Sequence, residues 1–122
     1  MKINITTRDL ELTDEVSEYV DKRLELVKKV LPGHKDGSAQ CDVVLVRETE
    51  HHQTGEIYTA EMRLKSGPLD AFVKASESTI LAAIDVAKDD LLRSMKNTRN
   101  KKATLWKKGA QRIKKMMRYL KF

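Results

Sequence analysis

The chain has 122 residues, of which 40% are hydrophobic and 34% are charged, as expected for one globular domain with its own core. The single cysteine, Cys41, excludes an intramolecular disulfide. The sequence shows neither a signal-peptide pattern nor an apolar run of the roughly 18 residues that a membrane span needs. We therefore expect a cytoplasmic protein with a net charge of +6.

The first two elements are expected to be a strand and an amphipathic helix. Residues 2–7 (KINITT) alternate apolar and polar side chains, which is the period of a half-buried strand. Thr13 is a suitable N-cap for the helix that follows, with acidic residues in its first turn. The apolar positions of this helix recur every three or four residues, at Val16, Val20, Leu24, Val27 and Leu31, and Pro32-Gly33 ends it.

Three consecutive strands are expected next. Residues 40–47 (QCDVVLVR) contain an apolar run typical of a central strand, and residues 48–55 form a polar hairpin connection. Residues 56–65 (EIYTAEMRLK) and 69–75 (LDAFVKA) alternate, and Ser66-Gly67-Pro68 between them predicts a tight turn. Strands joined by short turns pair as an antiparallel meander.

A second helix is expected to begin after Ser76 or Ser78, either of which can cap it. Its apolar stripe comprises Ile80, Ile84, Ala87, Leu91 and Met95. The resulting order is β-α-β-β-β-α. It predicts an α+β two-layer sandwich in which two helices cover one face of a four-stranded sheet.

The sequence offers little support for catalysis or metal binding. His51 and His52 are adjacent in a loop, and neither helical spacing nor a second cysteine supports a zinc site. Cys41 lies in a predicted strand and is expected to be a small buried hydrophobic residue. No glycine-rich phosphate-binding loop follows a strand. We expect neither an enzyme nor a cofactor, metal or small-molecule substrate.

Charge is distributed unevenly along the chain. Residues 93–122 contain twelve Lys or Arg and no acidic residue, whereas residues 1–92 contain twelve basic and eighteen acidic residues. The two parts therefore carry +12 and −6 with histidine neutral. A block of like charge repels itself unless a polyanion neutralises it, and nucleic acid is the commonest such partner.

The basic residues fall into three groups that we consider as candidates for RNA binding. On the first helix, Glu18, Asp21 and Glu25 lie among the cations, so an ordinary solvated face is an alternative there. On the second helix the acids stop before Arg93, and dipole complementation explains only one or two of the cations that follow. The candidates are Lys22, Arg23, Lys28 and Lys29 on the first helix, Lys88, Arg93, Lys96, Arg99 and Lys101 on the second, and Lys102, Lys107, Lys108, Arg112, Lys114, Lys115 and Arg118 beyond it.

Residues 103–121 can form a short amphipathic helix that Gly109 weakens by about 1 kcal/mol. Three alternatives remain open for it. It can fold onto RNA, with Trp106 and Tyr119 stacking on bases or ribose. It can lie on an anionic membrane, which we regard as the weaker alternative, or pack its apolar residues on the domain.

Two segments carry a resemblance to a known family. INITTRDLELTDEVSEYVDKRLE and ASESTILAAIDVAKDDLLRSM resemble the start and the second helix of the ribosome hibernation-promoting factors and ribosome-associated inhibitors. The resemblance covers residues 1–101 and implies a short-form domain there, with residues 102–122 as an unusual basic extension. It implies a stress-response factor that binds the small ribosomal subunit and its rRNA, occupies the tRNA/mRNA channel and blocks translation.

By this resemblance, Arg23 and Arg93 match basic residues of the family's two RNA-contacting helices. Lys29 falls where some members have lysine, and Lys101 continues the basic end of the second helix. The chain departs from the family where Leu26 and Asp90 replace lysines and where Ile80-Leu81 replaces a Met-Tyr pair. One hypothesis is that the basic extension compensates for these losses. The alternatives to a ribosome-binding inhibitor are a general double-stranded RNA-binding module and a membrane or protein adaptor that acts through the tail.

Overall fold

The computed structural model describes residues 1–31, 39–48 and 55–108, and the side chains among these up to residue 97. The chain forms two compact units, Met1–Leu92 and Arg93–Phe122, which are described separately. In chain order the elements are β1 (Lys2–Arg8), α1 (Asp14–Val30), β2 (Gln40–Glu48), β3 (Ile57–Ser66), β4 (Leu69–Glu77) and α2 (Ile80–Lys108).

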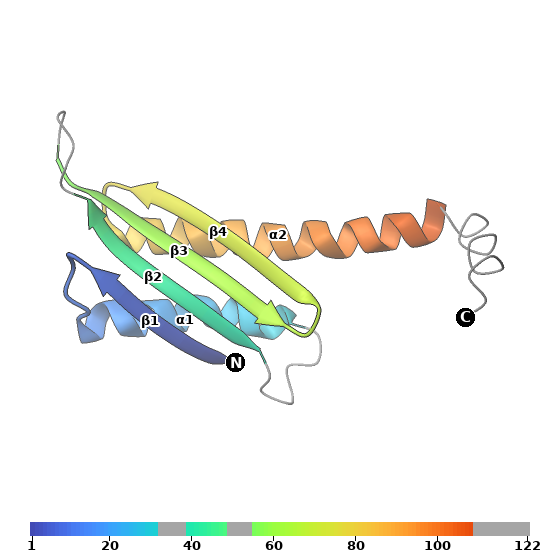
Figure 1. Ribbon diagram of the computed structural model, residues 1–122, viewed down its shortest axis with the longest axis horizontal. Helices are drawn as coiled ribbons and strands as arrows, with labels where there is room; N and C mark the ends of the chain where they lie inside the picture. Colours follow the sequence, from blue (N-terminus) through green and yellow to red (C-terminus); the bar gives the residue numbers. More distant parts are fainter. Residues whose placement is uncertain (32–38, 49–54, 109–122) are drawn as a thin grey trace. The chain divides into compact units, whose positions relative to one another are not determined.

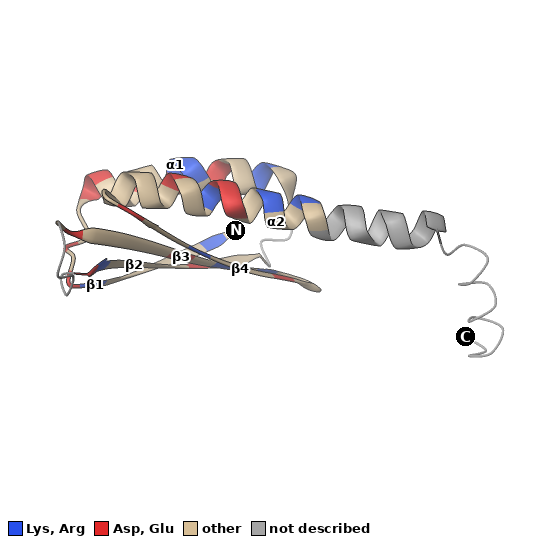
Figure 2. Cartoon of the chain, turned by 90° about the horizontal axis from the view of Figure 1, so that it is seen from above, with Lys and Arg blue, Asp and Glu red and all other residues tan. Residues whose placement is uncertain are grey.

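The strands form one mixed sheet in the order β1-β2-β3-β4 (Figure 1). β1 pairs with β2 in parallel, as expected for two strands joined through a helix, and the other two pairs are antiparallel. Within the first unit, α1 and the first part of α2 lie on the same face of the sheet (Figure 2). The predicted β-α-β-β-β-α sandwich is confirmed, as is the antiparallel meander.

The core lies between this face of the sheet and the two helices. The predicted stripe of the first helix is confirmed, because all five of its residues are buried. Alternate residues of the central strands supply the other side of the core. The fully buried side chains of the sheet include Cys41, Leu45, Ala60, Met62 and Leu64. Those of α2 include Ala83, Ile84, Ala87 and Leu91.

The N-cap of α1 is predicted correctly, whereas that of α2 is not. Thr13 Oγ1 accepts a hydrogen bond from the backbone N–H of Val16 at 3.2 Å. For α2, neither Ser76 nor Ser78 is the cap, because β4 continues to Glu77 and Thr79 Oγ1 accepts from Ala82 N–H at 3.2 Å. Ser76 instead pairs with Thr59 across the sheet, with 2.9 Å between the two hydroxyl oxygens.

The turn between β3 and β4 has the predicted composition. Ser66 and Leu69 are paired partners, so only Gly67 and Pro68 form the loop. Gly67 has φ +58°, a conformation that tight hairpin turns require and that glycine adopts without steric cost. The other predicted hairpin connection, including His51 and His52, falls mainly on residues 49–54, outside the described residues.

Cys41 is fully covered in β2, and burial together with the nearby Asp42 charge raises the pKa of its thiol to about 12. We expect the native protein to resist a disulfide thiol reagent at pH 8, since the reactive thiolate is scarce and the sulfur is inaccessible. The unfolded chain, with a thiol pKa of about 8.5, should react rapidly in denaturant. The reaction is followed by the absorbance of the thiol that the reagent releases, and equal reaction rates for the native and the denatured protein would contradict the burial of Cys41.

Candidate nucleic-acid interface

The basic residues of α1 do not share one environment. Lys22 and Lys29 are exposed, and their spacing of seven residues places them on one side of the helix. Lys28 is half-buried, and Lys28 and Lys29 complement the helix dipole in the last turn. None of these three lysines forms an ion pair within the described part of the chain. The exposed pair is therefore available to an external anion.

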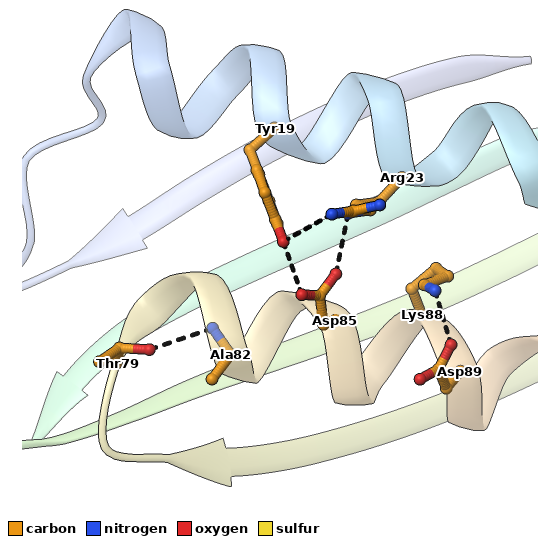
Figure 3. A network of polar contacts seen from close by, with 7 residues as sticks. All are labelled: Tyr19, Arg23, Thr79, Ala82, Asp85, Lys88 and Asp89. Carbon is orange, nitrogen blue, oxygen red and sulfur yellow. Dashed lines mark hydrogen bonds and ion pairs between the residues drawn. The ribbon is translucent and has the colours of Figure 1, made fainter.

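Arg23 faces α2 and takes part in a polar cluster between the helices (Figure 3). Its Nε lies 2.9 Å from Asp85 Oδ1, and its Nη2 donates to the Tyr19 hydroxyl at 3.0 Å. The Tyr19 hydroxyl donates in turn to Asp85 Oδ2 at 2.5 Å. We call Tyr19, Arg23 and Asp85 the interhelical cluster. It links residues of α1 to a residue of α2 that lies 66 positions from Tyr19 in the sequence.

Three contacts fix the orientation of the Arg23 guanidinium. Besides its contacts with the Tyr19 hydroxyl and Asp85, it lies over the Tyr19 ring, 4.6 Å from the centroid, in a cation–π arrangement. The Arg23 Nε and Asp85 Oδ1 form an ion pair by their distance. Nε is inaccessible to solvent, and its N–H does not point at Oδ1 closely enough to count as a hydrogen bond. The hydrogen bond to Tyr19 and the negative charge of Asp85 raise the pKa of Arg23, with Asp89 adding a smaller effect.

Lys88 is largely withdrawn from solvent, whereas the Arg23 side chain is 41% exposed. The Lys88 side chain is only 12% exposed, and its Nζ lies 2.6 Å from Asp89 Oδ1 (Figure 3). In this arrangement the ammonium is neutralised by a carboxylate of the neighbouring residue, and its alkyl stem is covered. Of the candidate residues in the first unit, Arg23 and Lys88 are thus already paired with acids of α2.

The remaining candidates begin at Arg93, where the second unit starts. Arg93 and Lys96 have exposed side chains. Arg99, Lys101, Lys102, Lys107 and Lys108 belong to α2, but their side chains are not among those described. Arg112, Lys114, Lys115 and Arg118 lie outside the described residues, so the predicted role of the tail is not tested by the structure.

Within the first unit, charge is ordered along the helices. Figure 1 shows that α1 and the first part of α2 run in the same direction across the sheet. Acidic residues Asp14 and Glu15 occupy the first turn of α1, and Lys28 and Lys29 occupy its last turn. An anion is therefore favoured near the C-terminal end of α1 over its N-terminal end.

Reasoning from sequence missed two functional candidates, Tyr19 and Asp85. The spacing of Tyr19 and Arg23, one helical turn apart, was a signal for a contact within α1. Nothing in the sequence alone indicated that Asp85 would meet them, because that contact depends on how the two helices pack.

The described residues contain no cluster of His, Cys, Asp or Glu that could hold a metal ion. Searched over the same part of the chain, no helix is long and apolar enough to cross a membrane.

Comparisons with known proteins agree with this fold. The chain resembles the N-terminal domain of Protein Y from Thermus thermophilus, with 27% identity, a TM-score of 0.64 and coverage of 80% of this chain and 99% of that one. It also shares the fold of a ribosomal subunit interface protein from Coxiella burnetii, with 11% identity, a TM-score of 0.65 and coverage of 82% and 99%. A search of curated proteins found no match.

The model of the family described as "Sigma 54 modulation protein / S30EA ribosomal protein" matches residues 3–103, which include all of α1, most of α2 and every strand residue except Lys2. This match confirms the resemblance given by the two sequence segments and indicates a ribosome-associated protein instead of an enzyme. The chain belongs to the Sigma 54 modulation protein / S30EA ribosomal protein family.

Proposed function

We propose that this protein binds the small ribosomal subunit, occupies its tRNA/mRNA channel and inhibits translation by contacting rRNA through basic residues. The observation that carries the proposal is the coincidence of a ribosomal family match with a segment of twelve cations and no acid after Leu92. Ribosomal RNA is a polyanion whose phosphates such a segment neutralises. As a translation factor it acts in the cytoplasm, under conditions that call for idle ribosomes.

Two features of the first unit support the same proposal. Lys22 in the middle of α1 and Lys29 in its last turn present two exposed cations on one side of the helix. A structurally similar protein from Coxiella burnetii is described as a ribosomal subunit interface protein, which is consistent with binding to the ribosome. Because residues 1–92 carry a net charge of −6, we attribute most of the phosphate contacts to the basic segment that follows Leu92.

A salt series tests the proposal. If about eight phosphates are engaged, affinity for purified small subunits should fall by about three to five decades between 50 and 200 mM salt. Co-sedimentation at several salt concentrations gives the affinity and the slope of log K against log salt. Displacement by mRNA and tRNA analogues tests whether the site is the channel.

Free duplex RNA and anionic vesicles are the controls for the other functions. Duplex RNA bound as tightly as small subunits would indicate a general RNA-binding module. Vesicle binding without ribosome binding would indicate a membrane adaptor. Pelleting with small subunits that is absent or insensitive to salt would contradict the proposed function.

A further inference from the structure

The interhelical cluster contains an arginine that is a candidate RNA contact by its place in the sequence, yet this side chain, although 41% exposed, already contacts partners within the chain. Arg23 matches a basic position of the family's first helix, and its guanidinium is held by Asp85, the Tyr19 hydroxyl and the Tyr19 ring. A guanidinium has five N–H donors in a rigid plane, so three simultaneous contacts fix its direction as well as its place.

Release of Arg23 to an RNA phosphate would be opposed electrostatically. The Asp85 carboxylate would lose its cation and would then lie close to the incoming phosphate, and like charges in proximity repel. Asp89, whose charge also acts weakly on Arg23, lies one turn further along α2, where Lys88 offsets its charge. Asp85 is therefore the main source of this repulsion. The space between the helices is therefore a poor site for a phosphate.

The exposed lysines of α1 form no ion pair among the described contacts, although the exposed Glu18 and Glu25 lie one helical turn from Lys22. Lys22 is adjacent to Arg23 in the sequence, and Lys29 lies two turns after Lys22 on the same side of α1. Because Arg23 ties this stretch of α1 to α2, the contacts of the cluster fix where Lys22 is presented relative to the rest of the first unit. The lysines supply the charge, and the cluster supplies their placement.

We propose that Tyr19, Arg23 and Asp85 are positioning residues that orient the lysines of α1 for ribosomal RNA, and that Arg23 does not itself contact a phosphate. This inference rests on the proposed function and deepens it. It assigns to Arg23 a role different from the one that the family resemblance implies.

The first experiment removes one hydroxyl without changing charge. Tyr19→Phe loses the hydrogen bonds to Asp85 and from Arg23, and we expect it to weaken binding to small subunits by about three- to tenfold at 100 mM salt. The slope of log K against log salt should stay unchanged, since no phosphate contact is lost. Tyr58→Phe is the matched control, because its hydroxyl donates to the Glu56 carboxylate at 2.7 Å and is not part of the interhelical cluster.

The second experiment replaces basic residues one at a time and measures the slope of log K against log salt, because this slope reports the number of phosphate contacts. Lys22→Ala and Lys29→Ala should each reduce the magnitude of the slope by about 0.9. Arg23→Ala should weaken binding while leaving the slope unchanged. Asp85→Asn should weaken binding relative to Asp21→Asn, which makes the same charge change at an exposed position of α1.

Opposite results would overturn the inference. A reduced slope for Arg23→Ala, or tighter binding for Asp85→Asn than for Asp21→Asn, would show that Arg23 contacts a phosphate. Unchanged affinity for both Tyr19→Phe and Arg23→Ala would show that the cluster is merely structural.

A thermal-unfolding double-mutant cycle of Arg23→Ala with Asp85→Asn uses no ribosomes. Non-additive shifts in melting temperature are expected, and strictly additive shifts would overturn the coupling itself. Failure of the wild-type protein to bind ribosomes would instead reject the proposed function, and the two failures are thereby distinguished.

Discussion

A chain that ends at Lys101 should bind small ribosomal subunits more weakly than the full chain by more than about two decades at 50 mM salt. The shortened chain lacks eight of the basic residues: Lys102, Lys107, Lys108, Arg112, Lys114, Lys115, Arg118 and Lys121. Within the first unit, Arg23 and Lys88 are already paired with acids, and the exposed cations that remain there are outweighed by the eighteen acidic residues of that unit. If half of about eight phosphate contacts are lost, the salt slope should change from about −7 to about −4.

The truncated chain retains the whole first unit and its core, so its thermal unfolding should remain cooperative. A full-length variant with glutamine at the eight basic positions is the matched control, because it removes charge without removing length. Both variants should show the same reduced slope in co-sedimentation. A truncated chain with the slope of the full chain would show that the tail does not touch RNA.

The fold was predictable because local patterns and packing agree. Strand residues such as those of β3 alternate in polarity with period two, and α1 repeats its apolar residues with the helical period. The turn at Gly67-Pro68 has a composition that favours a tight connection. These patterns specify which face of each element is buried, and one arrangement of the sheet and helices buries all of them.

The start of α2 was not predictable from capping propensity alone. Ser76, Ser78 and Thr79 are all good N-cap residues, so propensity does not choose among them. Pairing of β4 with β3 makes the choice, because it extends the strand through Glu77 and engages the Ser76 hydroxyl with Thr59. The decisive contact joins residues 17 positions apart, beyond the range of a local pattern.

The candidate interface was predictable in part. Charge counting identified the basic segment, and the spacing of seven residues is enough to place Lys22 and Lys29 on one side of α1, where both are exposed. The same reasoning grouped Arg23 and Lys88 with them, although both meet carboxylates of α2. A basic residue's partner depends on tertiary packing, and its position in a helical pattern does not reveal whether that partner lies inside or outside the protein.

The second large effect concerns stability. Leu24→Ala in α1 should lower the free energy of unfolding by about 2–5 kcal/mol, a large share of the roughly 5–15 kcal/mol of a typical domain. Leu24 is fully buried, so its truncation removes apolar contacts and leaves a cavity. For a domain of this size we expect the melting temperature to fall by more than about 10 °C. Urea denaturation with a fluorescence or circular dichroism readout measures the change in free energy.

Leu26→Ala is the matched control, since it makes the same substitution on the same helix two residues later. Leu26 is 43% exposed, and alanine has the higher helix propensity, so the change should stay within about 1 kcal/mol. Equal losses for the two variants would contradict the assigned face of α1. A small effect at Leu26 has a functional consequence, because this position then lies free of the core, between the exposed Lys22 and Lys29 in the sequence. Surface chemistry can vary there without cost to the fold, which is why a leucine can stand where the family resemblance places a lysine.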